Sequence, residues 1–315
     1  MDIHIIILNY NGMALLKKHL PSVIMAHNRC SYKSRITILD NGSTDGSLLY
    51  VRENFPEVNI SISPKNLVLI SYNAFIQQIK EKVILLLNND VRLSEDCIDL
   101  MMPHFLDSSV FFVSPLVLNK DGNDLNGGCM DFSFKYGLFQ NKFKQPTVNK
   151  YSLFIGSSVA FDRDKFLALS GYDSIYLPGT YEDVDICYRA WQRGWFGICE
   201  KKAIAYHDDS ASFNKEYGNK KRQIISARNA YIFVWKNIHS PTILCTNIIC
   251  YPLVIIFNMM RLRFDLVLGY LQAIFLLPAI FKRRIFCNRQ IKRTDSEIKQ
   301  LFNSTSGDKN VYTWN

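Results

Sequence analysis

The fold is decided by a stretch near the N-terminus, IHIIILNYNG at residues 3–12, in which an apolar run ends in small polar residues. The same pattern returns in RITILDNGSTDGS at residues 35–47 and in VILLLNND at residues 83–90. Helical apolar spacing fills the segments between them. Continuous Val, Ile and Leu runs that alternate with helices are typical of parallel strands buried on both faces. The sequence therefore predicts an α/β fold with a mostly parallel central sheet flanked by helices.

Further elements follow this alternation less regularly as far as about residue 235. Helices are expected near 13–25, 44–54, 71–80, 95–106, 163–169 and 182–193. Ser43 or Thr44 is the expected N-cap of the second of these helices. Other strands are expected at 58–62, 110–118 and 151–161, with a loop and a hairpin between 119 and 149. We expect a catalytic domain over 1–235, an apolar and basic helical region over 236–293, and a polar tail over 294–315.

The composition excludes several classes of protein. Of 315 residues, 48% are hydrophobic and 21% charged, which suits a large core and excludes disordered and low-complexity chains. The eight cysteines form no CxxC pair, so we expect free thiols in a reducing compartment. The start of the chain lacks a basic n-region and a long apolar run, so we expect it to begin in the cytosol.

Positive charge is concentrated in the last third of the chain. Residues 211–315 hold 16 Lys and Arg against 5 Asp and Glu, and they include the uncharged runs 242–260 and 266–281. Apolar runs with basic flanks indicate an anionic membrane surface as partner, not nucleic acid. Because Pro252 and two asparagines interrupt the first run, we expect a helical hairpin over 242–281 that dips into the cytosolic leaflet. Two spanning helices, or two helices packed on the catalytic domain or on a partner subunit, remain open.

Polar side chains follow three strands of the predicted sheet. Asn9 and Asn11 follow the first strand, Asp40 the second, and the run from Asn88 to Asp90 a third. The carboxyl ends of parallel strands form the ligand-binding edge of an open sheet. No GxGxxG or GxxxxGK[ST] motif is present, which excludes a standard dinucleotide or P-loop site. Carboxylates at this edge favour Mg²⁺ or Mn²⁺ shared with the phosphates of a substrate.

Five blocks of sequence together carry a resemblance to a known family. They are residues 5–12, 39–47, 85–90, the pair 156–158 and 171–173, and the pair 182–185 and 206–207. In this order they resemble the family 2 inverting glycosyltransferases of GT-A fold, in their rhamnosyltransferase-like branch. The resemblance covers about residues 3–235. It implies metal-dependent transfer of a sugar from a nucleotide-diphosphate donor to an acceptor hydroxyl.

The resemblance also implies roles for single residues. Asp40 would bind the nucleotide base, Asp90 and His207 a divalent cation with the donor diphosphate, and Asp183 would be the catalytic base. Further donor-binding positions are Asn9, Asn11, Asn66, Asn73 and Asn89. Two departures from the family pattern are Asn88, where the family has an aspartate, and the bulky residues 67–70, where the family is rich in glycine.

Each of these residues also has a plainer interpretation. Asp40 could cap a turn, Asp90 and His207 could lie in ordinary turns, and Asp183 could be a first-turn acid of a helix. We interpret the chain as a glycosyltransferase that acts at the cytosolic face of the cell membrane on a lipid-linked or cell-surface glycan. The alternatives are a catalytically impaired sugar- or membrane-binding homologue and a nucleotidyltransferase-like enzyme.

Overall fold

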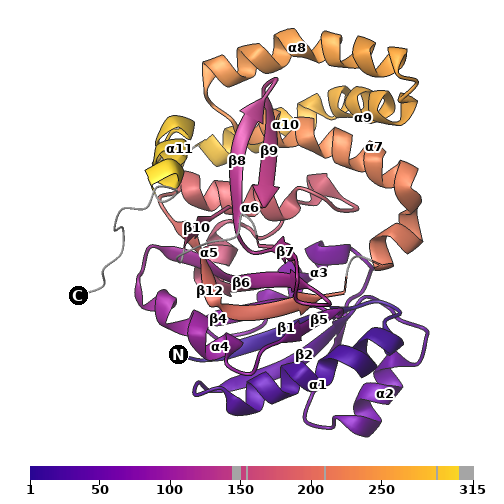
Figure 1. Cartoon of the computed structure of the whole chain (residues 1–315), viewed down its shortest axis with the longest axis vertical. Helices are drawn as coiled ribbons and strands as arrows, with labels where there is room; N and C mark the ends of the chain where they lie inside the picture. Colours follow the sequence, from indigo (N-terminus) through magenta and orange to yellow (C-terminus); the bar gives the residue numbers. More distant parts are fainter. Residues whose placement is uncertain (144–149, 154, 209–210, 289, 305–315) are drawn as a thin grey trace. The chain divides into compact units, whose positions relative to one another are not determined.

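The computed structural model describes residues 1–143, 150–153, 155–208, 211–288 and 290–304 (Figure 1). The chain divides into two compact units. Unit 1 comprises Met1–Met130, Phe143–Tyr172 and Phe196–Asp209. Unit 2 comprises Asp131–Lys142, Asp173–Trp195 and Ser210–Asn315. The functional division at residues 235 and 293 stays a prediction.

Unit 1 is built on a mixed sheet of order β10-β12-β6-β11-β4-β1-β2-β3, with β5 beside β12 and β7 beside β6. Its strands are β1 (Ile3–Asn9), β2 (Ser34–Asp40), β3 (Asn59–Ile62), β4 (Val83–Asn88), β5 (Val91–Leu93), β6 (Val110–Asn119), β7 (Leu125–Gly127), β10 (Lys150–Ser152), β11 (Ser158–Asp162) and β12 (Phe196–His207). The pairs β1–β2, β1–β4, β2–β3 and β6–β12 are parallel, whereas β11 is antiparallel to both neighbours. The predicted α/β fold with a mostly parallel central sheet is confirmed.

Helices cover this sheet as the apolar spacing predicts. They are α1 (Met13–Arg29), α2 (Ser47–Asn54), α3 (Ser71–Ile76), α4 (Cys97–Met101) and α5 (Arg163–Ala168), with 3₁₀ turns η1 (Val68–Ile70) and η2 (Met102–Leu106). The central strands are fully buried, and Ile5 of β1 and Leu85 of β4 have exposed fractions of 0%. The register pairs Asn9 with Asp40 and Leu8 with Asn88, so the polar ends of the three strands lie level with one another.

Two local predictions are wrong. Helix α2 begins at Ser47 and has Gly46 as its N-cap, in the left-handed region at φ 81° and without a side-chain cap. Ser43 does not cap this helix, because its hydroxyl donates to Asp40 at 2.6 Å. The strand predicted over 151–161 is two strands, β10 and β11. The helix predicted near 95–106 is present over Cys97–Leu106, and its second half is the 3₁₀ turn η2.

Unit 2 is mainly helical. It contains the hairpin β8 (Met130–Lys135) and β9 (Leu138–Phe143), the turn η3 (Ser174–Tyr176), and helices α6 (Glu182–Gln192), α7 (Ala211–Asn237), α8 (Pro241–Met260), α9 (Phe264–Phe275), α10 (Leu277–Asn288) and α11 (Asp295–Ser304) (Figure 1). Trp191 of α6 is fully buried, and its ring lies 5.9 Å from that of Phe302. The hairpin predicted between 119 and 149 and the helices predicted over 242–281 are present.

One glycine of the sheet tests the packing of unit 1. Gly197 of β12 pairs with Phe112 of β6, and a methyl group at Gly197 would overlap the buried Phe112 ring. We expect Gly197→Ala to lower the free energy of unfolding by about 1–3 kcal/mol, since an overpacked core must shift. Urea denaturation measures the change. Leu106→Ala is the control, because Leu106 is 84% exposed and should alter stability little.

Candidate functional site

The loop after β2 is organised by the carboxylate of Asp40, which is fully buried. Its Oδ1 atom accepts hydrogen bonds from Asn9 Nδ2 at 2.9 Å and from the Ser43 hydroxyl at 2.6 Å. Its Oδ2 atom accepts from the backbone N–H groups of Gly42 at 2.9 Å and Ser43 at 2.7 Å. Asp40 therefore has the turn-capping role that the sequence left open. Its contact with a nucleotide base stays a prediction.

The buried amide of Asn9 connects this loop to the next strand end. Its Nδ2 atom also donates to Ser47 Oγ at 3.0 Å, and its Oδ1 atom accepts from Asn89 Nδ2 at 2.8 Å. A side chain at Gly12 would overlap the amides of Asn9 and Asn89. Three loops of the sheet edge thus meet at one asparagine.

Asn11 extends the same arrangement towards the surface. Its Oδ1 atom accepts from the Thr44 N–H at 2.8 Å, and its own N–H donates to Ser43 Oγ at 2.8 Å. The structure therefore brings four of the predicted site residues into one hydrogen-bonded group, Asn9, Asn11, Asp40 and Asn89.

The bulky segment 67–70 lies beside this group. Asn66 Oδ1 accepts from the Val68 N–H at 3.1 Å, and the Val68 carbonyl accepts from Asn41 Nδ2 at 3.3 Å. Val68 has φ 52°, a left-handed conformation that is unfavourable for a β-branched residue. Asn66 therefore holds a strained backbone in this structure, and its contact with the donor stays a prediction.

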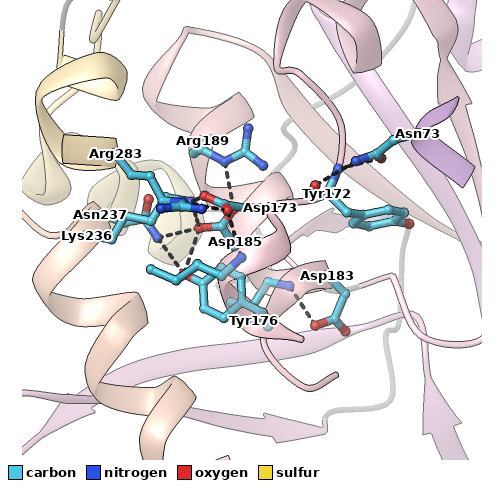
Figure 2. Close-up of polar contacts among 12 residues, drawn as sticks. Asn73, Tyr172, Asp173, Tyr176, Asp183, Asp185, Arg189, Lys236, Asn237 and Arg283 are labelled. Carbon is cyan, nitrogen blue, oxygen red and sulfur yellow. Dashed lines mark hydrogen bonds and ion pairs between the residues drawn. The ribbon is translucent and has the colours of Figure 1, made fainter. Parts of the chain in front are cut away.

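Asn73 of α3 braces another part of unit 1. Its Nδ2 atom donates to the Tyr172 carbonyl at 2.8 Å, and its Oδ1 atom accepts from the Tyr172 N–H at 2.9 Å (Figure 2). Both ends of the amide are therefore used by one backbone segment. The predicted donor contact of Asn73 is not tested by this arrangement.

Asp90 and His207 lie together, as a shared cation requires. Strand β5 pairs with β12 so that Val91 lies opposite His207, and the Asp208 N–H donates to the Asp90 carbonyl at 3.1 Å. Asp90 Oδ1 lies 3.2 Å from His207 Nε2. This Oδ1 atom is buried and has no hydrogen-bond partner among the described residues. A buried carboxylate oxygen without a hydrogen bond is suited to bind a cation.

The opposite nitrogen of the His207 ring faces Asn126 of β7, which the sequence did not indicate. Asn126 Nδ2 lies 3.3 Å from His207 Nδ1. An imidazole that binds a cation through Nε2 carries its proton on Nδ1. Rotation of the Asn126 amide by 180° would place its oxygen there as acceptor. Within the described part of the chain, no group of three or more His, Cys, Asp or Glu residues is placed to hold a metal ion.

Two carboxyl groups open helix α6 in unit 2. Asp183 is half-buried, and its Oδ1 atom accepts from the Val184 N–H at 2.8 Å. Burial raises the pKa of Asp183 to about 6, although that backbone hydrogen bond acts to lower it. Burial and the charge of Asp183 raise the pKa of Glu182 to about 8. The expected stabilisation of the charge by the helix N-terminus is therefore outweighed by burial, but Asp183 is still mostly ionised at neutral pH.

Asp185, one turn into the same helix, is held by a buried polar network (Figure 2). Its Oδ1 atom accepts from Tyr176 Oη at 2.9 Å, Lys236 Nζ at 2.7 Å and Asn237 Nδ2 at 2.8 Å. Its Oδ2 atom accepts from Arg189 Nε at 2.7 Å. The cations of Arg189 and Lys236 outweigh burial and hold the pKa of Asp185 well below its usual range. Asp185 therefore stays ionised at neutral pH, and both of its oxygens are used in structural hydrogen bonds, which makes it a poor candidate for a catalytic base.

The network continues to helix α10. Lys236 Nζ also lies 2.8 Å from Asp173 Oδ2, and Arg283 Nε of α10 donates to Asp173 Oδ1 at 2.9 Å (Figure 2). Lys236 is 1% exposed, so both of its carboxylate partners neutralise a charge that has no access to water. Helices α6, α7 and α10 are thereby joined by ionic contacts.

Asn229 of α7 fixes the segment that precedes α6. Its Nδ2 atom donates to the carbonyls of Tyr176 at 2.9 Å, Gly179 at 2.7 Å and Thr180 at 2.8 Å. Thr180 and Tyr181 have φ of 67° and 71°, so two successive residues are held in the left-handed region immediately before Glu182. No sequence pattern indicates the roles of Asn229 and Lys236, because a polar residue in a long helix ordinarily faces solvent.

Lys236 provides a test of the network. Lys236→Met should lower the free energy of unfolding by about 3–5 kcal/mol, since it leaves two buried carboxylates without their shared cation. Chemical denaturation measures the loss. Lys220→Met is the matched control, because Lys220 lies on the exposed part of the same helix and should change stability by less than about 0.5 kcal/mol. Equal stability of the two variants would contradict the assignment.

Comparison with solved structures supports the fold. The mannosyltransferase PcManGT from Pyrobaculum calidifontis, in complex with GDP-Man and Mn²⁺, aligns over 98% of this chain and 88% of its own, with a TM-score of 0.54 and 14% identity. TarS 1–349 of S. aureus with UDP-GlcNAc aligns over 78% of this chain and 70% of its own, with a TM-score of 0.55 and 11% identity. GalNAc-T7 with UDP, GalNAc and Mn²⁺ gives a TM-score of 0.53 at 14% identity over 73% of this chain, which spans about half (51%) of that protein.

Comparison by sequence identifies the family. No curated protein sequence matches the chain. Residues 4–168, more than half of the chain, match the profile of Glycosyl transferase family 2. This segment contains β1 and β2, which end at Asn9 and Asp40, and β4, which is followed by Asp90. The α/β sheet with its ligand-binding edge, the solved structures that share it and the matching profile agree, and the chain belongs to glycosyl transferase family 2, with the GT-A fold.

Proposed function

We propose that this family 2 enzyme transfers a hexosyl or deoxyhexosyl group from a nucleotide-diphosphate sugar to an acceptor hydroxyl, with inversion at the sugar carbon. The observation that carries the proposal is the buried Asp90 Oδ1 atom, without a hydrogen-bond partner in the described residues and 3.2 Å from His207 Nε2. It lies at the strand edge where open α/β sheets bind their ligands. The rhamnosyltransferase-like branch stays a prediction.

Other polar atoms at this edge also lack partners and support a donor pocket. Among the described residues, Asn41 Oδ1 and the hydroxyls of Ser157 and Ser158 are buried without a hydrogen bond. The Asn88 N–H donates to the Ser157 carbonyl at 3.0 Å, so these serines lie next to the end of β4. Buried polar groups are ordinarily satisfied, and the hydroxyl and phosphate oxygens of a nucleotide-sugar could satisfy these.

Asp90 and His207 would hold a Mn²⁺ or Mg²⁺ ion together with donor oxygens. A carboxylate, an imidazole and phosphate oxygens are ligands that Mn²⁺ accepts. When bound, the cation would stabilise the charge on the departing nucleoside diphosphate. The complexes of PcManGT and GalNAc-T7 with Mn²⁺ support this proposal.

Asp183 would take the proton from the acceptor hydroxyl. Its carboxylate is half-buried and mostly ionised at neutral pH, which suits a general base. Glu182 is a poorer candidate, because it is 7% exposed and its pKa of about 8 keeps it mostly protonated. Inversion in one displacement requires the acceptor and its base on the face of the sugar opposite the departing diphosphate.

The acceptor would be a lipid-linked or cell-surface glycan intermediate, reached from the cytosolic side of the membrane. The long apolar helices of unit 2 and the basic residues beside them support this location. The strained Val68 and its bulky neighbours favour the alternative of a catalytically impaired homologue. The hydrogen-bonded group around Asn9 and the Asp90–His207 pair favour an active enzyme.

The first test removes the proposed cation ligand. A panel of UDP-, GDP- and dTDP-sugars should include at least one that raises the melting temperature only with Mn²⁺. We expect Asp90→Asn to abolish that protection without lowering the melting temperature of the free protein, because it removes the charge and keeps the shape. Asp164→Asn, which alters a carboxylate that is 79% exposed in α5, should keep the protection. Full Mn²⁺-dependent protection of Asp90→Asn would refute the assignment.

The second test concerns the base. Asp183→Asn should reduce turnover by about 10²–10⁴-fold with unchanged donor affinity, because the amide cannot accept a proton. Activity of the unmodified enzyme should rise with pH through about 6, as the Asp183 carboxyl loses its proton. Steady-state kinetics and donor titration provide both measurements. Glu182→Gln is the neighbouring control and should retain turnover. Parallel loss of donor affinity and turnover in Asp183→Asn would make its role structural.

A further inference from the structure

Helix α8 has the reverse polarity of a helix on a water-soluble surface. Its outward residues are large and apolar, with exposed fractions from 53% to 79%, and they are Ile248, Ile249, Leu253, Ile256, Phe257 and Met260. They recur at spacings of three and four, so they form one continuous stripe. Helices in water normally expose the polar face and bury the apolar one, so water does not suit this stripe.

The polar side chains of Asn247 and Tyr251 fasten α8 to the rest of unit 2, whereas Thr242 and Thr246 are exposed. Asn247, 1% exposed, accepts from Trp235 Nε1 at 2.8 Å and donates to the Gly137 carbonyl at 3.3 Å. Tyr251 Oη donates to the Tyr270 carbonyl of α9 at 2.6 Å. These contacts tie α8 along its length to α7, to the hairpin and to α9, and Figure 1 shows α8 and α9 side by side.

The apolar exposure continues beyond α8. We use the name outer apolar face for the six α8 residues together with further large side chains that are 38% to 83% exposed, which are Leu262, Phe264, Leu268, Leu271, Ile274, Phe275, Phe281, Ile285 and Phe286. Opposite this face, α9 packs closely on α7, since a side chain at Gly269 would overlap the Ile224 carbonyl. Exposed apolar patches of this extent mark interaction surfaces.

Basic residues border the outer apolar face. Arg261 lies over the Phe257 ring at 4.6 Å. Arg263 Nη2 donates to Gln223 of α7 at 2.9 Å, which brings the turn between α8 and α9 beside the exposed side chains at 220–222, two lysines and an arginine. Lys282 is exposed on α10. The exposed Tyr136 and Lys135 occupy the hairpin tip next to Asn247.

We propose that the outer apolar face is a membrane-binding surface that inserts into one leaflet of an anionic bilayer, with α8 parallel to the membrane plane. The apolar side chains enter the boundary between headgroups and acyl chains, and the bordering cations contact lipid phosphates. This deepens the proposed function, since it places the enzyme where a lipid-linked acceptor resides. It does not depend on that function, because lipid binding is measured without any sugar.

The contacts of α8 favour this arrangement over two others. Its length of 20 residues and its apolar composition would permit a span, as would α9 and α10 together with a bend of 61°. A spanning α8 would have to leave Trp235 and Gly137 and place Asn247 in hydrocarbon without those partners. A second copy of the chain would bring two rims of like charge together, which disfavours association through this face.

Sedimentation of the purified full chain with vesicles tests the proposal. We expect binding to vesicles of equal parts phosphatidylcholine and phosphatidylglycerol, and much weaker binding to phosphatidylcholine alone. Leu253→Glu combined with Phe257→Glu should abolish binding, because two charges enter the apolar layer. Leu49→Glu is the matched control and should bind normally, since Leu49 is 59% exposed on α2 of unit 1. Lys220→Gln should weaken binding about fivefold, as expected for the loss of one cation near an anionic surface.

Several results would overturn the proposal. One is that the unmodified chain binds neither kind of vesicle. Another is that the unmodified chain is a dimer and the double variant is a monomer. A third is labelling of Leu262→Cys by an impermeant thiol reagent in intact cells beyond that of the unmodified chain, which would show that α8 spans. Thermal unfolding of each variant verifies that it is folded. If donor binding fails while vesicle binding holds, the proposed function falls and this inference remains.

Discussion

A single buried amide, that of Asn9, holds the polar edge of unit 1 together. Parallel pairing of β1 with β2 and β4 sets the three strand ends level, but the loops that follow them need a common anchor. Asn9 supplies it, because its Nδ2 atom donates towards the Asp40 loop while its Oδ1 atom accepts from Asn89. An amide can do both at once, whereas a carboxylate in its place could only accept. The position of Asp90, one residue after Asn89, depends on this anchor.

The buried carboxylates of Asp90 and Asp185 differ in how fully their oxygens are hydrogen-bonded. In unit 1, Asp90 Oδ1, Asn41 Oδ1 and two serine hydroxyls are buried without a hydrogen bond among the described residues, which suits a binding site for a polar ligand. In unit 2, both oxygens of the Asp185 carboxylate accept hydrogen bonds from neighbouring side chains. Unsatisfied groups cost free energy, so they persist where function requires them, and satisfied ionic groups rigidify the structure around them.

The sequence predicted the sheet well, because runs such as 83–87 are too apolar and too short for anything but a buried strand. It also predicted that Asp90 and His207 would meet, which no local pattern shows, and that expectation came from the resemblance to a family. The prediction for the N-cap of α2 is wrong because the Ser43 hydroxyl donates its hydrogen bond to Asp40 and does not cap the helix. The Asp185–Lys236 ion pair could not be predicted from the sequence, because the partners are 51 residues apart and lysine ordinarily lies at the surface.

The C-terminal helices are part of the structural frame of unit 2. Asp295 of α11 accepts from Tyr188 Oη at 2.6 Å and from the His239 N–H at 2.6 Å, and Arg284 of α10 donates to the Trp235 carbonyl at 2.8 Å. The Lys292 N–H donates to the carbonyl of Gln192, the last residue of α6, at 2.7 Å. Truncation of the chain before the apolar helices, to obtain a smaller soluble enzyme, would therefore expose the buried side chains of α6. Solubility would have to come from redesign of the outward residues, with the chain left at full length.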